Sequence, residues 1–376
     1  MNIAPFETEH FYAQYEFNTP YQLCNSDCET VAVETLLDMA DMSLAQFGRL
    51  TLGYTESQGN PHLRESLAEA YASATADDIL VLGTPVEGIY LAARALLEPS
   101  DEVIVLTPAY DALINLFEHV VDDGNVKKWA FQSTPTGWLL DFAELEQLIT
   151  PKTKLLVVNF PHNPTGFLPT IDQVQQLAAL AEKHDFWLFY DEMYFGLVHS
   201  GTPTIPSAAD VTKRAIVLSG LSKTYGLPGL RTGWLVIRDK ALYDHFANWK
   251  FYTSICPPAP SEFLAVAGWR VRDQLRDRSI AQIEANLELA EAFFARWPEL
   301  FDWKRPLSGS TALIKLHVPS VTALAAQLAA EAGVLIHPAT TLGMTDDQHM
   351  RMGFGRKAFG EALERFEAYL VENGFE

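Results

Sequence analysis

Residues 215–234 read Ala-Ile-Val-Leu-Ser-Gly-Leu-Ser-Lys-Thr-Tyr-Gly-Leu-Pro-Gly-Leu-Arg-Thr-Gly-Trp. The apolar, β-branched start of this stretch predicts a strand, and the glycines and proline at 226–229 predict a turn. Lys223 lies between the strand and the turn, and Arg231 follows the turn. A lysine amine forms Schiff bases with carbonyl groups, and the planar guanidinium of an arginine suits phosphate. The stretch therefore predicts a site for a ligand that offers both a carbonyl and a phosphate.

The chain around this stretch alternates short apolar runs with helical patterns. Such alternation is typical of a mainly parallel sheet in an α/β fold, and parallel strands buried on both faces are expected to be continuously apolar. The helix between the third and fourth strands is expected at residues 171–181, where the apolar positions have helical spacing. The candidate strands are Ile79–Leu82, Val103–Leu106, Leu155–Asn159, Trp187–Tyr190, Ala215–Leu218 and Trp234–Ile237.

The pattern changes after about residue 260, where long helical segments such as Ile280–Trp297 lead to isolated strands such as Ala312–Leu316. This change predicts a smaller α+β domain, which the N-terminal segment completes. We place the large domain at residues 41–260 and the small domain at residues 1–40 together with residues 261–376.

The composition is that of an ordinary globular protein, with 48% hydrophobic and 20% charged residues among 376. The formal net charge of −21 argues against nucleic acid or an anionic membrane as a partner. No segment has the roughly 18 uninterrupted apolar residues that a membrane helix needs. The first residues show no signal-peptide pattern, and three cysteines do not form a disulfide framework. We therefore expect a cytoplasmic protein without a metal site.

Six further segments carry turn-forming or polar residues, and most of them follow a predicted strand. Thr84, Pro85 and Glu87 predict a helix start with a capping box, and a helix N-terminus at the carboxyl end of a strand is also a phosphate-binding position. Asp191 comes directly after an apolar strand, so we expect it to be partly buried and to need a partner. The segments are Gly53–Arg64, Gly83–Gly88, Thr107–Tyr110, Asn159–Gly166, Tyr190–Tyr194 and Arg351–Arg356.

Taken together and in this order, the segments resemble the class I/II aminotransferases, the fold-type I pyridoxal phosphate-dependent enzymes. The resemblance covers about residues 54 to 356. It implies an aspartate aminotransferase-like α/β fold, in which a large domain with a mainly parallel seven-stranded sheet accompanies a smaller α+β domain. It also implies pyridoxal 5'-phosphate as the cofactor, held by Lys223 as an internal aldimine.

The resemblance implies roles around the cofactor ring for four other residues. Asp191 would pair with the protonated pyridine nitrogen, so that the ring remains an electron sink. Asn163 and Tyr194 would hydrogen-bond the phenolic oxygen, and Tyr110 would stack on the ring. Lys223, once released by the incoming amino acid, would be the general base at Cα.

At the phosphate the resemblance implies Arg231 and Ser222, together with the turn at Pro85 and Val86. This chain departs from the family pattern here, because Pro85 has no N–H, Val86 has no hydroxyl and Gly220 stands where the family often has a serine. Those departures remove phosphate donors that the family commonly has.

Arg351, with Asn163, would bind the substrate α-carboxylate in a bidentate pair. Tyr54 would reach the cofactor phosphate of a neighbouring subunit, which implies a homodimer with shared active sites. The segment Tyr21–Cys28 is expected to fold over the site.

These residues predict an aminotransferase that moves an amino group between an amino acid and a 2-oxo acid. The same segments would serve a β-lyase, an aldol-type cleavage, a decarboxylase or an amino acid cyclase, because substrate orientation selects the Cα bond that breaks. A remote alternative is a cofactor-binding regulator without catalysis.

Overall fold

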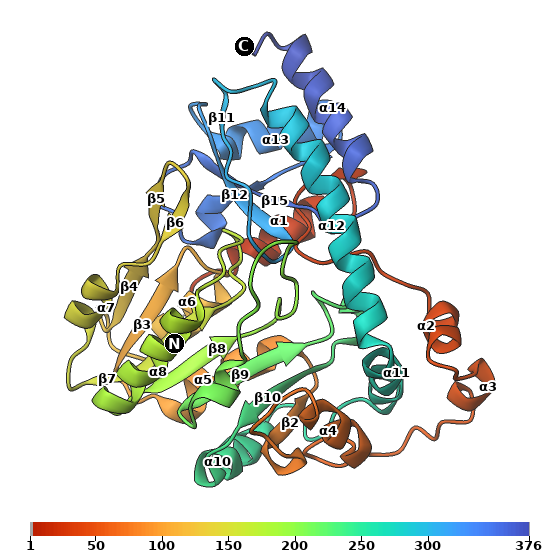
Figure 1. Cartoon of the computed structure of the whole chain (residues 1–376), viewed down its shortest axis with the longest axis vertical. Coiled ribbons are helices and arrows are strands. Elements are labelled where there is room, and N and C mark those ends of the chain that lie inside the picture. Colours follow the sequence, from red (N-terminus) through yellow and green to blue (C-terminus); the bar gives the residue numbers. More distant parts are fainter. Residues whose placement is uncertain (1–2, 376) are drawn as a thin grey trace.

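The computed structural model describes residues 3–375, and its centre is a seven-stranded sheet (Figure 1). The strand order is β2–β10–β9–β8–β7–β3–β4. Strand β10 is antiparallel to both of its neighbours, and the other adjacent strands are parallel. The mainly parallel seven-stranded sheet is thus confirmed, and β4 is the strand that the apolar pattern did not indicate. The strands are β2 (Ile79–Leu82), β3 (Glu102–Thr107), β4 (Val126–Ala130), β7 (Thr153–Asn159), β8 (Trp187–Asp191), β9 (Ala215–Gly220) and β10 (Gly233–Ile237).

Helices cover both faces of this sheet. Side chains alternate along a strand, so Ile79 and Val81 of β2 join one hydrophobic core, and Leu80 and Leu82 join the other. The first core includes residues of α2 (Val33–Met39), α4 (Pro61–Ala68), α7 (Phe142–Leu148), α8 (Ile171–His184), α9 (Ala208–Val211) and α11 (Ala259–Arg270). The second includes residues of α5 (Pro85–Leu96), α6 (Ala112–Glu118) and α10 (Lys240–Lys250).

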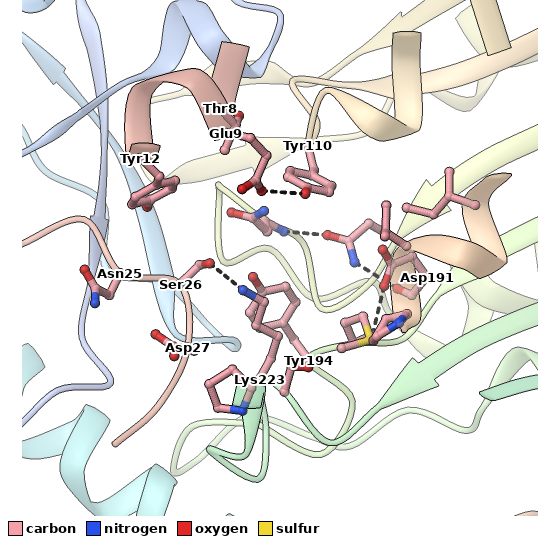
Figure 2. A pocket seen from close by; sticks show the side chains of 18 of the residues that line it. Thr8, Glu9, Tyr12, Asn25, Ser26, Asp27, Tyr110, Asp191, Tyr194 and Lys223 are labelled. Atoms are coloured by element: carbon pink, nitrogen blue, oxygen red, sulfur yellow. Dashed lines mark hydrogen bonds between the residues drawn. The ribbon is translucent and has the colours of Figure 1, made fainter. Parts of the chain in front are cut away.

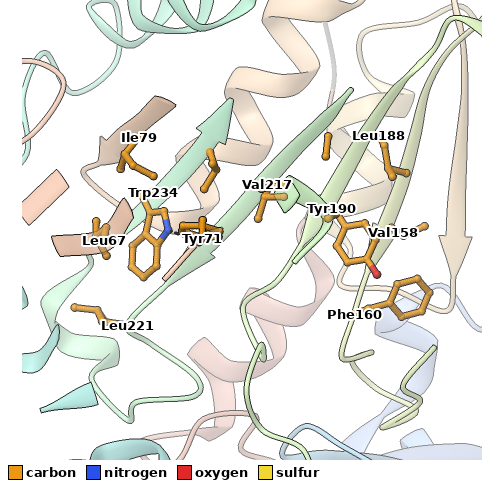
Figure 3. Packing of buried hydrophobic residues seen from close by; sticks show 14 of the residues in the cluster. Leu67, Tyr71, Ile79, Val158, Phe160, Leu188, Tyr190, Val217, Leu221 and Trp234 are labelled. Atoms are coloured by element: carbon orange, nitrogen blue, oxygen red, sulfur yellow. Dashed lines mark hydrogen bonds between the residues drawn. The ribbon is translucent and has the colours of Figure 1, made fainter. Parts of the chain in front are cut away.

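Figure 3 shows part of the first core, where Trp234 of β10 packs beside Tyr71. The Trp234 indole donates a hydrogen bond to the Tyr71 hydroxyl at 2.9 Å, so both rings are buried with their polar atoms paired. Leu221, which lies two residues before Lys223 in the chain, is buried in the same core. The start of the lysine loop is therefore anchored in the packing of the large sheet.

A four-stranded antiparallel sheet, of order β11–β12–β15–β14, lies at the other end of the molecule (Figure 1). It packs with three helices round a hydrophobic core of its own. The short strand β1 (Tyr21–Gln22) pairs in parallel with β13 (Val334–Leu335), so the N-terminal segment joins these later elements. They are α12 (Arg272–Phe294), β11 (Phe301–Asp302), β12 (Thr311–Leu316), α13 (Val321–Glu331), β14 (His337–Pro338), β15 (His349–Gly353) and α14 (Phe359–Glu372).

The limits that the sequence suggests for two domains, 41–260 and 1–40 with 261–376, remain predictions. The other elements are α1 (Glu7–Tyr15), α3 (Leu44–Phe47), the hairpin of β5 (Gln132–Thr134) and β6 (Gly137–Leu139), and 3₁₀ turns at Ala76–Asp78, Pro228–Leu230 and Ala339–Leu342. None of the helices in residues 3–375 is long and apolar enough to cross a membrane.

Candidate active site

A cavity of about 380 Å³ lies at the carboxyl ends of β7, β8 and β9. Every site residue that the sequence indicates, with the exception of Tyr54, lines this cavity, although these residues come from segments far apart in the chain. Several are labelled in Figure 2. The lining residues of the predicted set are Pro85, Val86, Tyr110, Asn163, Asp191, Tyr194, Ser222, Lys223, Arg231 and Arg351.

The loop after β9 presents Lys223 to the cavity. This loop closes on itself, because the backbone N–H groups of Leu221 and Leu227 donate to Thr232 O at 3.2 Å and Leu221 O at 3.0 Å. Gly226 has φ +64°, and a Cβ there would lie 2.4 Å from the backbone oxygen of Glu29, so only glycine fits this turn. The Lys223 amine donates to the Ser26 hydroxyl at 2.8 Å (Figure 2).

Arg231 lies where the lysine loop meets the N-terminus of α5. Its guanidinium donates to Pro228 O at 2.9 Å and to the Thr84 hydroxyl at 2.7 Å. The predicted capping box at Thr84 is wrong: the Thr84 side chain makes no cap hydrogen bond, and the Glu87 carboxylate accepts from Gly83 N at 2.8 Å. The charged donor Arg231 takes the hydroxyl that would otherwise have capped α5.

Asp191 ends β8 and is 6% exposed. Its Oδ1 accepts a hydrogen bond from Met193 N at 2.9 Å, but no cation among residues 3–375 forms an ion pair with it. Burial raises the pKa of Asp191 from its ordinary 3.8 to about 7, against the opposing influence of that hydrogen bond and of the Lys223 charge. The expectation that Asp191 is buried is therefore confirmed.

Arg351 lies on β15 and is 2% exposed. Its guanidinium donates to Asn163 Oδ1 at 3.3 Å, to the Tyr12 hydroxyl at 2.5 Å and to Cys24 O at 3.0 Å. All three acceptors are neutral, and the Arg351 Nε finds no acceptor in the described part of the chain. A buried cation without an anion is costly, so this position favours an anionic ligand.

Asn163 is held in place from both sides. The Asn159 side chain, at the end of β7, accepts from Asn163 N at 2.8 Å, and the Asn163 side chain accepts from Arg351. Asn159 in turn donates to the backbone oxygen of Asp191 at 2.9 Å. The Asn159 side chain, which holds the backbone of Asn163, is thus hydrogen-bonded to the neighbouring strand, β8.

Helix α1 forms a wall of the cavity that the sequence did not reveal (Figure 2). Thr8, Glu9, Tyr12 and Glu16, at or just after this helix, line the cavity. The Tyr110 hydroxyl donates to Glu9 Oε1 at 2.9 Å. The apolar pattern of the helix is weak and none of the recognised segments includes it, so no local sequence signal indicated this role.

The segment after β1 lies over the cavity as expected. Asn25, Ser26 and Asp27 line it, and the Asp27 carboxylate pairs with Arg356 at 2.7 Å. Gly355, next to Arg356, lies so close to this segment that a Cβ would be 2.4 Å from the backbone oxygen of Asp27. The N-terminal segment is therefore packed tightly against the chain that follows β15.

Tyr54 lies outside the cavity and is 92% exposed. Leu52, close to it in the same irregular stretch, is also highly exposed. The role of Tyr54 in a neighbouring subunit stays a prediction.

Comparison with known proteins connects this geometry to a family. The profile of the family described as "Aminotransferase class I and II" matches residues 20–365. Capreomycidine synthase of Streptomyces vinaceus is 29% identical over 319 residues, which are 85% of this chain and 80% of that relative.

Two solved structures are similar over essentially all of the chain. One is a PLP-dependent aminotransferase from Streptococcus suis, with a TM-score of 0.92 and 26% identity over 100% of both chains. The other is the PLP-dependent cyclase OrfR, with a TM-score of 0.90 and 25% identity over 100% of this chain and 99% of the other. The aspartate aminotransferase-like fold that the sequence implied is thereby confirmed.

Proposed function

The chain belongs to the aminotransferase class I and II family, and we propose that it moves an amino group from an amino acid to a 2-oxo acid at the cavity that holds Lys223. It is a pyridoxal phosphate-dependent enzyme. The observation that carries this function is the gathering, in one cavity, of the Lys223 amine, the buried Asp191 carboxylate and the buried Arg351 guanidinium.

The residues present fit the cofactor. Asp191 is a buried carboxylate without a cation, which a protonated ring nitrogen would supply. The Ser222 hydroxyl is buried beside Lys223 and has no partner in residues 3–375, so a phosphate oxygen could accept from it. Pyridoxal phosphate, when bound, supplies an electron sink for negative charge at the substrate Cα. Tyr110 would stack on its ring, and Tyr194 and Asn163 would hydrogen-bond its phenolic oxygen.

The phosphate end of the site depends mainly on Arg231, whose guanidinium is fixed by Thr84 and Pro228 O. Pro85 and Val86 line the cavity there, but Pro85 offers no N–H. Packing explains why a glycine stands at position 220, because a Cβ there would lie 3.0 Å from Thr232 O and 3.1 Å from the Met193 side chain. A serine would crowd this site, so Ser222 takes the place of the missing hydroxyl.

At the reacting end, Arg351 binds the substrate carboxylate and Asn163 orients the guanidinium. This anchors the substrate so that its Cα–H bond faces the Lys223 amine, which removes the proton and returns it. Helix α1 and residues 25–27 line the cavity beside these groups.

A second candidate is cyclisation of an amino acid substrate at the same residues, because the structure of the cyclase OrfR is so similar to this chain. The reactions differ in what they do with nitrogen. Transamination passes the amino group to a 2-oxo acid, and cyclisation of one substrate needs no acceptor.

The test is to incubate purified holoenzyme with ¹⁵N-labelled amino acids and a panel of 2-oxo acids, and to follow the label by mass spectrometry. We expect ¹⁵N in a new amino acid formed from the 2-oxo acid. Consumption of the labelled amino acid at an undiminished rate without any 2-oxo acid, with a cyclic product that keeps all the carbon atoms and the ¹⁵N of the substrate, would instead establish the second candidate.

The assembly and location are also part of this proposal. A homodimer would complete each site with Tyr54 of the other subunit, which is consistent with the full exposure of Tyr54 in the single chain. A cytoplasmic location is supported by the three cysteines, all of which are free thiols.

A further inference from the structure

The charges that line the cavity do not balance. Four carboxylates line it, from Glu9, Glu16, Asp27 and Asp191, together with three cations, from Lys223, Arg231 and Arg351. In the proposed function every cation has a partner, since Arg231 takes the phosphate, Arg351 takes the substrate carboxylate and Lys223 holds the cofactor. The surplus charge is therefore negative.

Two of the four carboxylates are already accounted for. Asp191 faces the cofactor ring, and Asp27 is paired with Arg356 at 2.7 Å. Glu9 and Glu16 remain. Glu9 accepts only the Tyr110 hydroxyl, at 2.9 Å, and no donor in residues 3–375 bonds the Glu16 carboxylate.

The neighbours of Glu16 increase the electrostatic cost of holding a negative charge at this side chain. Burial, followed by the negative charges of Asp27 and Glu9, raises the pKa of Glu16, while Arg356 and Lys223 lower it by less. Glu16 is partly buried and Glu9 is exposed although it lines the cavity, so the two carboxylates act on one another on the solvent-facing side of the cavity. A cation placed among them would remove this repulsion and gain charge-assisted hydrogen bonds.

A buried guanidinium in the same cavity favours a ligand that also carries a carboxylate, as an amino acid does. Arg351 is almost fully buried in the same cavity, and its Nε has no acceptor in the described chain. Glu9 and Tyr12 come from the same face of α1, and Tyr12 bonds Arg351. A ligand whose carboxylate binds Arg351 therefore occupies the cavity that Glu9 and Glu16 also line.

We propose that the amino acid substrate has a positively charged side chain, an ammonium or a guanidinium, which Glu9 and Glu16 bind at the α1 wall of the cavity. This inference rests on the proposed function. The same carboxylates repel a dicarboxylic amino acid or 2-oxo acid, so the amino acceptor is a 2-oxo acid whose side chain has no negative charge.

The first experiment compares pairs of amino acids that differ in charge and little in shape, on the wild-type holoenzyme. L-arginine is paired with L-citrulline, and L-lysine with L-norleucine. The absorbance change of the bound cofactor on titration gives Kd, whichever reaction follows. We expect the cationic member to bind at least about tenfold more tightly, the usual effect of a hydrogen-bonded charge pair. The pair with the larger ratio of Kd values shows whether the site prefers a guanidinium or an ammonium group.

The second experiment uses Glu16→Gln and Glu9→Gln, with Glu7→Gln as the matched control on the exposed face of the same helix. Glu16→Gln should raise the Kd of the cationic amino acid about tenfold and change the Kd of the neutral one by less than about threefold. Glu9→Gln should act in the same direction. Glu7→Gln should keep the wild-type preference.

The outcomes separate this inference from the proposed function. Equal binding of charged and neutral members by the wild type, or an undiminished preference in Glu16→Gln and Glu9→Gln, overturns the cationic substrate even if amino transfer is observed. A clear preference for the cation without transfer of ¹⁵N to any 2-oxo acid overturns transamination and leaves the substrate class standing.

Discussion

Lys223 and Asp191 reach the same cavity from the ends of neighbouring parallel strands, β9 and β8. Each side chain is in a state that the cofactor would change: within residues 3–375 the lysine amine hydrogen-bonds only Ser26, and the carboxylate is buried without a cation. Both residues can therefore be tested by measurements other than turnover.

Replacing Lys223 by alanine should abolish the covalent attachment of pyridoxal phosphate. After borohydride reduction and proteolysis, the wild type should carry the cofactor mass on the peptide that contains Lys223, and Lys223→Ala should carry none. The exposed Lys213, which lies at the start of the same region, provides the control, since Lys213→Ala should be labelled like the wild type. Stoichiometric label on any other lysine of Lys223→Ala would place the cofactor elsewhere.

Replacing Asp191 by asparagine should change how the stability of the cofactor-free protein depends on pH. Native Asp191 holds its proton up to about pH 7, and the unfolded chain releases it near 3.8, so wild-type stability falls as the pH rises between these values. Asp191→Asn has no ionisable group at this position, so its stability does not fall in this way. At pH 8 its free energy of unfolding should exceed that of the wild type by up to about 4 kcal/mol.

Urea unfolding at pH 4 and pH 8 measures this effect as a difference between the two proteins, so the other buried acids, such as Glu192, cancel. Asp172→Asn, at an exposed carboxylate in the first turn of α8, should follow the wild type at both pH values. A constant difference between Asp191→Asn and the wild type across the range would mean that Asp191 is ionised in the cofactor-free protein.

Among the elements, α1 lines the cavity and donates a hydrogen bond from its first turn to a distant side chain. Its N-cap residue, Phe6, offers no side-chain acceptor to the first free N–H groups of the helix. Thr8 N is instead bonded by the buried Asp111 carboxylate at 3.2 Å, from the start of α6. The wall that carries Glu9, Tyr12 and Glu16 is therefore pinned to the large sheet through Asp111.

Asp111→Ala should loosen α1 without disturbing the sheet. A hydrogen bond to a charged acceptor is lost, so amide hydrogen exchange in residues 7–15 should become about tenfold faster. The strands of the large sheet should exchange as in the wild type. Asp122→Ala, at an exposed carboxylate, is the control. Unchanged exchange in α1 would show that packing alone holds the helix.

The element patterns also show why β4 was not indicated by the sequence. Val126-Lys127-Lys128-Trp129-Ala130 contains two lysines, and the strand lies at the edge of the sheet next to β3. Only Trp129 of this strand is fully buried, and Lys127 pairs with Glu102. Because β4 is partly exposed, it lacks the continuous apolar run of the buried strands, which include β2 at the other edge of the sheet. Lysines are common on exposed edge strands because they discourage pairing with another chain.

At the scale of the whole molecule, the exposed Tyr54 makes the prediction of shared sites testable. Lys223→Ala and Tyr54→Ala chains should each be inactive alone if Tyr54 completes the neighbouring site. Mixed dimers should then contain one site with neither lesion and regain activity, at up to about half of the wild-type level per such dimer. Sedimentation checks that the mixed dimers form. Absence of rescue in confirmed mixed dimers would place Tyr54 outside the partner's site.

The sequence by itself determined the sheet and the residues at the ends of its strands. Apolar runs bounded by turn formers indicated six of the seven strands, all except β4, and Asp191, Asn163 and Lys223 lie at the end of three of them or within four residues of it. Because the carboxyl ends of parallel strands meet at one edge, local patterns were sufficient to bring these three side chains together. The helix start at Pro85 was also predicted correctly, although the capping box predicted at Thr84 was wrong.

The tertiary structure alone decided which groups surround Asp191, Asn163 and Lys223. The contact of Arg351 with Asn163 joins residues 188 positions apart, and its contact with Tyr12 joins residues 339 positions apart. The docking of α1 on Asp111, and the surplus of carboxylates that follows from it, likewise depend on which buried polar groups remain to be paired once the cores have packed. No local pattern encodes that choice, because periodicity and turn chemistry report on neighbours in the chain and these partners are neighbours only in the fold.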